Sequence, residues 1–180
     1  MEALKTMGAI AMAAACWQSA NAHVVLEQKS AVAGSYYKAT FMVGHGCDGR
    51  ATTSVNVKLP PGIESARPQP KAGWTVAVRM EKLATPVVLH GKTYDERVAE
   101  ITWTGGPLDA AHYDEFVVLA KLPKQTGPLA FGFTQYCGND AKLEWTGPAG
   151  SSSPAPVLEL TEPAASPTAK PGDAPHRHHH

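Results

Sequence analysis

Hydrophobic and polar residues alternate with a period of two along most of the chain. The clearest segment is Tyr36–Val43, in which Tyr37, Ala39, Phe41 and Val43 share one face. Such a face is typical of a β-strand with one side against a core. The segments that read as strands are 23–28, 36–43, 53–59, 74–80, 98–104, 113–122, 129–136, 142–145 and 157–161. We therefore predict about eight or nine strands.

Turn-forming residues separate these segments. Glycine, proline, asparagine and aspartate gather at 34–35, 60–62, 72–73, 105–107 and 138–140. No segment shows the spacing of an amphipathic helix. Many short strands at even spacing predict an all-β fold, namely one antiparallel β-sandwich of immunoglobulin or cupredoxin type over residues 23–162.

The first 22 residues have the features of an export signal. Lys5 supplies a positive start, and residues 7–15 form an apolar run of small side chains. The run is shorter than the about 20 residues that a transmembrane helix needs. Ala20 and Ala22 occupy the −3 and −1 positions of a cut before His23. We predict cleavage between Ala22 and His23 and a mature protein that is periplasmic or secreted.

The cysteines divide between this leader and the mature chain. Cleavage after residue 22 removes Cys16 and leaves Cys47 and Cys137. A lipoprotein cut at Cys16 is disfavoured because the preceding three alanines lack the usual leucine. Two cysteines in an exported protein predict one disulfide, which we favour over a Cys/His metal site that uses the nearby His45.

The net charge and the composition of the C-terminal segment limit the classes of binding partner that we expect. The formal net charge is zero and no basic patch contains interleaved aromatic residues, so we expect no nucleic-acid partner. Residues 163–180 are rich in proline and alanine and cannot bury a core, which predicts a disordered tail. The tail ends in a histidine cluster at 176–180. Arg177 interrupts the cluster, which argues against a purification tag, and we favour a native metal-scavenging tail over an arbitrary terminus.

His23 is the most informative residue for function. At a new N-terminus its α-amine and its imidazole Nδ1 bind one metal in a single chelate ring. The amine has a pKa of about 7.7–8.0, so a metal displaces its proton near neutral pH. Cu(II) prefers a plane of nitrogen donors and has the highest affinity among the divalent first-row ions. The other possibility is that His23 is merely the residue where a signal peptide ends.

Four stretches resemble the YcnI-like copper-binding domain family, a family of bacterial exported β-sandwiches. They run from AHVVLEQKS to LPPGI, then RPQPKAGWTV, ITWTGGPLDAAHYDEF, and FGFTQYC with LEWTGP. The resemblance implies copper handling without catalysis. It also implies Cu(II) held by a single-histidine brace, with a carboxylate and a tryptophan nearby.

Carried to this chain, the resemblance assigns the brace to His23 and the tryptophan to Trp145. The carboxylate maps to Asp109, with Glu115 as the alternative and His112 as an extra ligand. Read from the residues alone, Asp109 is equally a turn carboxylate, and Glu115 equally marks the start of a strand.

The remaining aromatic and histidine residues receive other roles. An indole has only a donor N–H, so Trp145 is expected to shield the site rather than to ligate copper. Trp74 and Trp103 are predicted to be core residues. His45 and His90 are predicted to lie in surface loops.

The sequence thus favours an exported, non-enzymatic Cu(II) carrier for copper trafficking or homeostasis. Its expected partners are the copper ion and either a membrane copper transporter or another periplasmic copper carrier. A histidine-brace copper oxygenase is an alternative that needs a second histidine, His112 or His45. A metal-independent adhesive or structural sandwich is the other alternative.

Overall fold

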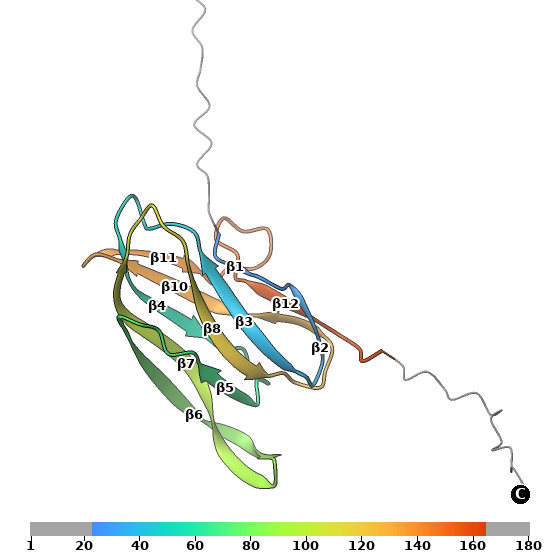
Figure 1. The fold of residues 1–180 in the computed structure, drawn as a ribbon. Helices are drawn as coiled ribbons and strands as arrows, with labels where there is room; N and C mark the ends of the chain where they lie inside the picture. The colour runs from blue at the N-terminus through green and yellow to red at the C-terminus, as the bar shows by residue number, and fades with distance from the viewer. Residues whose placement is uncertain (1–22, 165–180) are drawn as a thin grey trace, which may run out of the picture.

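The computed structural model describes residues 23–164, which form a β-sandwich that contains no helix within that range (Figure 1). The predicted all-β fold is confirmed. The predicted signal peptide lies outside the described residues, as does all of the predicted tail beyond residue 164.

Twelve strands make up the sandwich, more than the eight or nine that alternation predicts. Their bounds are β1 Val25–Leu26, β2 Ser30–Val32, β3 Tyr36–Val43, β4 Thr52–Lys58, β5 Ser65–Pro68, β6 Trp74–Leu89, β7 Lys92–Leu108, β8 Asp114–Lys121, β9 Gly127–Ala130, β10 Gly132–Cys137, β11 Ala141–Trp145 and β12 Val157–Thr161. The short strands β2 and β5 show no alternation, and the predicted strand 129–136 divides into β9 and β10.

The strands form two main layers and a small third sheet. One layer has the order β1-β3-β8-β5 and the other β11-β10-β4-β7-β6, while β2-β12-β9 closes one side. All pairs are antiparallel except β12 with β2. β9 and β10 belong to different sheets, which is why one predicted strand becomes two.

The core lies between the two layers and is dominated by aromatic rings. Phe41 of β3 lies 5.4 Å from the ring centre of Phe131 and 5.6 Å from that of Phe133. Trp103 of β7 packs at 5.6 Å against Phe116 of β8, and its Nε1 donates to a backbone carbonyl. All five side chains are fully buried, and each contributes about 1.5–3 kcal/mol by that burial.

The glycine pair 105–106 is not the turn that the sequence predicts. β7 continues through it to Leu108, which pairs with Thr52 of β4. Gly105 has a φ of 139°, and a Cβ there would lie 2.4 Å from the carbonyl oxygen of Gly73. The glycine is therefore required by a close backbone approach, and the chain reverses later, over residues 109–113.

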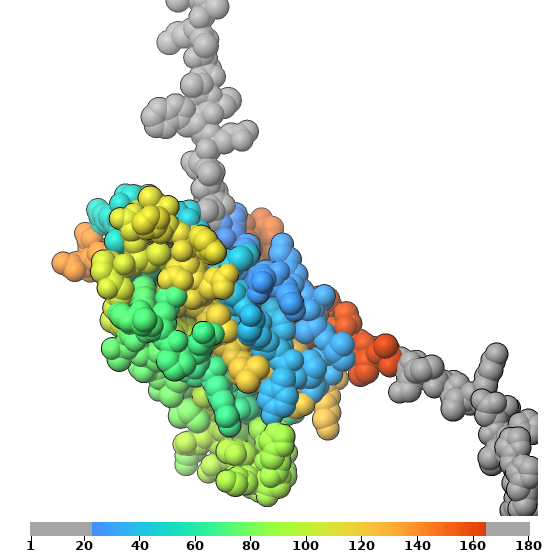
Figure 2. Space-filling view, in the orientation of Figure 1, coloured from blue at the N-terminus to red at the C-terminus, as the bar shows by residue number. Residues whose placement is uncertain are grey.

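β6 and β7 form a long hairpin that projects beyond the sandwich (Figures 1 and 2). The two strands contain 16 and 17 residues, more than twice the predicted lengths. Residues 82–89 and 92–96 include no fully buried side chain, so this part of the hairpin carries no core-facing hydrophobic alternation. At the tip, His90 has a φ of 50° and its Nε2 is 2.8 Å from the hydroxyl of Tyr36.

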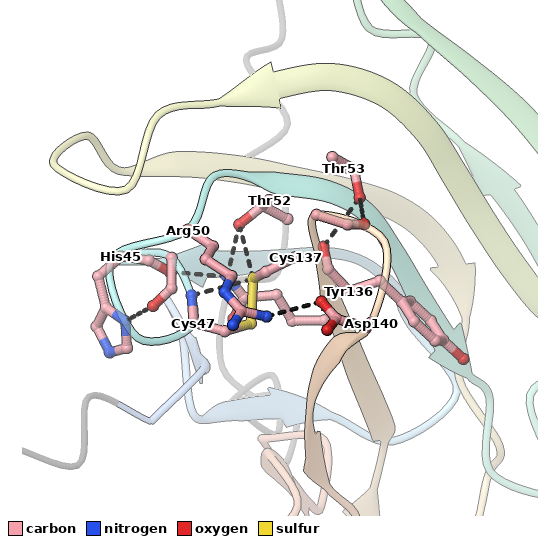
Figure 3. The surroundings of a disulfide bond; sticks show 11 residues. His45, Cys47, Arg50, Thr52, Thr53, Tyr136, Cys137 and Asp140 are labelled. Atoms are coloured by element: carbon pink, nitrogen blue, oxygen red, sulfur yellow. Dashed lines mark hydrogen bonds and ion pairs between the residues drawn. A yellow bond between two sulfur atoms is a disulfide. The ribbon is translucent and has the colours of Figure 1, made fainter.

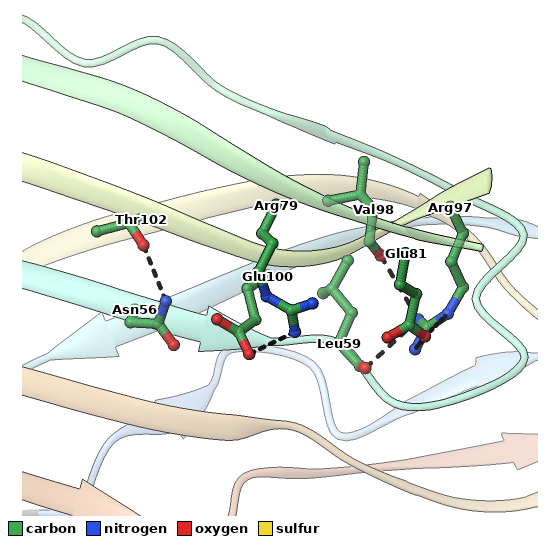
Figure 4. Close-up of polar contacts among 8 residues, drawn as sticks. All are labelled: Asn56, Leu59, Arg79, Glu81, Arg97, Val98, Glu100 and Thr102. Atoms are coloured by element: carbon green, nitrogen blue, oxygen red, sulfur yellow. Dashed lines mark hydrogen bonds and ion pairs between the residues drawn. The ribbon is translucent and has the colours of Figure 1, made fainter.

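Charged side chains hold the base of this hairpin (Figure 4). Arg97 is only 8% exposed, and its guanidinium ion-pairs with Glu81 and donates to the Pro60 carbonyl at 3.1 Å. Further along, Arg79 donates to Glu100 at 2.7 Å and lowers the pKa of that carboxyl. Arg97 thus connects the hairpin to the segment that follows β4.

The buried phenol of Tyr37 gives a test of the packing around β1 and β3. Its hydroxyl donates to the Gln28 carbonyl at 2.6 Å. Burial, aided by the charge of Glu27, raises the pKa of Tyr37 to about 12, against about 10 when unfolded. Between these two pH values the folded state retains a proton that the unfolded state loses. The contribution of the protonated phenol to the free energy of unfolding is therefore complete below pH 10 and is lost as the pH rises through 12.

We expect ultraviolet titration to show one tyrosine that ionises near pH 12 and that is missing in Tyr37→Phe. The free energy of unfolding of the wild type should fall more steeply than that of Tyr37→Phe between pH 10 and 12. Identical titration curves for the two proteins would contradict the burial of this phenol.

Candidate metal centre

His23 lies at one end of the sandwich, where the described chain begins. Val25 pairs with Met42, so the antiparallel register places His23 opposite Gly44, directly after β3. The loops 44–51 and 109–113 occupy this same end, and the connection from β11 to β12 passes beside it (Figures 1 and 2). Val24 and Leu26 are buried, while His23 and Val25 are half-buried, which continues the strand alternation.

The loop 44–51 is anchored by the predicted disulfide, Cys47–Cys137, which is confirmed. Both sulfurs belong to buried residues, and the Cys47 N–H lies 3.0 Å from the Cys137 Sγ (Figure 3). Arg50 and Asp140 add an ion pair at 2.7 Å, but both side chains are exposed and the pair stabilises little. The disulfide joins the connection between β3 and β4 to the end of β10.

A buried amide fixes the first half of this loop. Gln135 of β10 is 1% exposed, and its Nε2 donates to the His45 carbonyl at 2.7 Å and to the Thr52 hydroxyl at 2.6 Å. Gly46 donates to the Ala110 carbonyl at 3.3 Å. A Cβ on Gly46 would lie 1.8 Å from a backbone oxygen, so only glycine fits at that position.

His45 is not the surface residue that the sequence predicts. It lies in a loop, but its side chain is half-buried. Its Nδ1 is hydrogen-bonded to the Gly46 carbonyl. Its Nε2 is buried and has no hydrogen-bond partner among residues 23–164. His90, by contrast, is exposed at the hairpin tip, as predicted.

The reversal 109–113 carries two of the predicted ligands. Asp109 is exposed, and its Oδ1 accepts from the Ala111 N–H at 2.8 Å. The His112 N–H donates to the Asp109 carbonyl at 3.1 Å, and the His112 side chain is exposed. Asp109 therefore stabilises its own turn, and this leaves its second carboxylate oxygen available.

Glu115, the alternative carboxylate, lies near the start of β8. It pairs with Met42, which pairs in turn with Val25, so Glu115 is two strands away from β1. The Lys71 ammonium ion-pairs with Asp114 at 2.6 Å and also donates to the Glu115 carbonyl at 3.3 Å. The Lys71 ammonium thus already neutralises the carboxylate of Asp114, the residue next to Glu115.

The three tryptophans in question all contact the core. Trp103 is fully buried, as predicted, and Trp74 is half-buried and packs at 5.1 Å against Phe116. Trp145 is 6% exposed and packs at 6.1 Å against Phe133. It belongs to the same buried cluster as Val24 of the N-terminal segment.

Side chains alone do not assemble a metal centre here. Among residues 23–164, no three histidine, cysteine, aspartate or glutamate side chains lie close enough to hold a metal ion. Asp109, His112 and Glu115 are therefore not gathered with His23 into one cluster. A metal at this end needs a main-chain donor, which the α-amine of a mature His23 would supply. The unpartnered ring nitrogen of His45 also fits a metal-binding end.

A hollow lies away from this end of the domain, between the β6–β7 hairpin and the sheet that contains β3. It has a volume of about 530 Å³ and is lined by Tyr36, Met80, Leu119 and neighbouring residues. This hollow could not be predicted from local patterns, because its walls come from distant strands. No helix in the described part of the chain has the length and apolarity to cross a membrane.

Comparison with known proteins extends this description. The family model described as "Domain of unknown function (DUF1775)" matches residues 23–160. A crystal structure of an uncharacterized protein from Nocardia farcinica, reported to have an immunoglobulin-like fold, is 27% identical with a TM-score of 0.60. The alignment covers 77% of this chain and 97% of the Nocardia chain. No curated protein matches the sequence.

The buried amide of Gln135 gives a test of how this end is held. Gln135→Met keeps the size of the side chain but leaves the Thr52 hydroxyl and the His45 carbonyl without their donor. We expect the free energy of unfolding in urea to fall by about 1–3 kcal/mol. Hydrogen exchange should accelerate at the Gly46 and Cys47 amides.

Tyr136→Phe is the matched control, because Tyr136 lies next in β10 and is 41% exposed. It should change stability by less than about 0.5 kcal/mol. Unchanged exchange at Gly46 in Gln135→Met would show that the amide does not hold the loop.

Proposed function

The chain belongs to the DUF1775 family, which is the YcnI-like family, and we propose that it is an exported Cu(II)-binding protein for copper trafficking or homeostasis. The observation that carries the proposal is that the family match starts at His23. A domain that begins at this residue agrees with cleavage after Ala22, which would convert an internal histidine into an N-terminal one.

The chemistry of an N-terminal histidine supports Cu(II) as the metal. The amine and the imidazole of His23 would give two nitrogen donors in one chelate ring, and such donors in a plane suit Cu(II). Binding would release the amine proton, which is inexpensive near neutral pH because the amine pKa is about 7.7–8.0. His23 is half-buried, so part of the residue is exposed to solvent at this end of the sandwich.

Asp109 is the carboxylate that we favour for the same site. Its neighbour Ala110 accepts a hydrogen bond from Gly46, so the loop 109–113 packs against the loop that begins opposite His23. One of its two oxygens is not used in the turn. Glu115 remains the alternative, and His112 a possible additional ligand in the same loop as Asp109.

Trp145 is proposed to shield the copper from the core side. Its ring is 6% exposed and packs against Phe133 in the core. If Trp145 lies beside the metal, Cu(II) bound at His23 will quench tryptophan fluorescence. Exchange of copper with a membrane transporter or another periplasmic carrier is consistent with a site at an exposed end of the domain.

The test is a copper titration of the mature chain that starts at His23, with the four histidines at 176 and 178–180 replaced by alanine so that the tail cannot bind. We expect one tight Cu(II) site by calorimetry and quenching of tryptophan fluorescence. His23→Ala should weaken it by more than about 100-fold, since loss of outer-shell partners alone weakens metal sites about 10–100-fold.

Acetylation of the His23 α-amine is the matched control, because it keeps the imidazole and removes the amine as a ligand. It should weaken copper binding as His23→Ala does. If the His23→Ala protein retained the tight site, the brace would be excluded. Absence of any tight site in the unsubstituted protein would favour a metal-independent role.

A further inference from the structure

The imidazole of His45 carries its proton on a defined nitrogen. Its Nδ1 is hydrogen-bonded to the Gly46 carbonyl. A carbonyl oxygen only accepts hydrogen bonds, so Nδ1 must bear the hydrogen of the neutral ring. The lone pair of the ring is therefore on Nε2.

The Nε2 lone pair accepts no hydrogen bond from residues 23–164. Nε2 is buried, and no donor within the described part of the chain reaches it. Buried polar atoms are nearly always hydrogen-bonded, because an unmade bond leaves the full desolvation penalty. A histidine whose N–H is fixed by a backbone carbonyl and whose other nitrogen is unpartnered has the arrangement found in metal-ligating histidines.

The position of His45 brings this nitrogen to the end of the domain that holds His23. The β1–β3 register places His23 opposite Gly44, the residue before His45. Figure 3 shows the His45 ring pointing away from the disulfide, on the side where the pale blue start of the described chain passes. The strand register and Figure 3 therefore both place the His45 ring at the end of the domain where His23 lies.

The backbone around His45 is held rigidly, as a pre-organised ligand requires. Its carbonyl accepts from the buried Gln135 amide at 2.7 Å. The next residue, Gly46, is locked between the Ala110 carbonyl and the backbone at Arg50. Cys47, the residue after Gly46, is fixed by the disulfide.

From these observations we propose that His45 Nε2 is a further ligand of the metal bound at His23, so that the site has two imidazole nitrogens and one amine nitrogen. The inference rests on the proposed function and deepens it, since it names a ligand for the same site. Three nitrogen donors suit Cu(II) over metals that prefer oxygen. A second histidine is also what the copper-oxygenase alternative requires, so this proposal concerns the ligand set and does not choose between carrier and oxygenase.

The test uses the full mature chain from His23, with the tail histidines replaced by alanine as above and all nitrogen as ¹⁴N. It is loaded with less than one equivalent of Cu(II). Pulsed EPR counts the coordinated imidazoles, because combination lines arise only when two or more bind the same ion. We expect two imidazoles in the unsubstituted site and one in His45→Gln, with Kd raised about 10–100-fold.

His90→Gln is the matched control, since His90 is exposed at the tip of the β6–β7 hairpin, remote from the His23 end of the domain. It should retain two imidazoles and an unchanged Kd. Circular dichroism and thermal unfolding of His45→Gln establish that the variant is folded. The wild-type imidazole count needs no substitution and so tests the proposal even if the variant does not fold.

The outcomes separate the two proposals. One imidazole in the wild type, with binding that still depends on His23, overturns the role of His45 and leaves the copper function intact. The same holds if folded His45→Gln keeps two imidazoles. Absence of a tight site that depends on His23 overturns the proposed function itself, and the role of His45 with it.

Discussion

The disulfide between Cys47 and Cys137 fixes the place where the chain crosses from one sheet of the sandwich to the other. It closes a loop with a sequence separation of 90, which in the chain-entropy model stabilises the fold by about 4 kcal/mol. Its larger consequence is local. Because the crossover cannot move, the residues just before Cys47 have one conformation, and β10 supplies the buried amide of Gln135 that holds them.

Under the proposed function, rigidity at this end would let the domain present metal donors although residues 23–164 contain no cluster of metal-binding side chains. The sandwich contributes one loop held by the disulfide, a second loop packed against it through Ala110, and a strand that starts at the surface. None of these alone is a binding site. Together they surround His23, so under the proposed function cleavage of the chain would also complete the metal site.

Much of this structure follows from local pattern, and the rest depends on distant residues. The alternating face of Tyr36–Val43 and the cysteine pair were sufficient to predict a disulfide-bonded sandwich. The strand β5 was missed because it is short and ends in Pro68. At the site, the importance of His23 is visible in the sequence. The environment of His45 is not, because it depends on an amide 90 residues away and on the carbonyl of Gly46.

The β6–β7 hairpin has a practical consequence for work on this protein. Its tip, at His90 and Gly91, lies at the end of the molecule remote from the loops 44–51 and 109–113 (Figure 1). The contact of His90 with Tyr36 gives the tip a defined place on the domain. A dye or a surface linker attached there leaves the N-terminus unmodified. The domain can thus be immobilised in one orientation for measurements in which that terminus must stay chemically free.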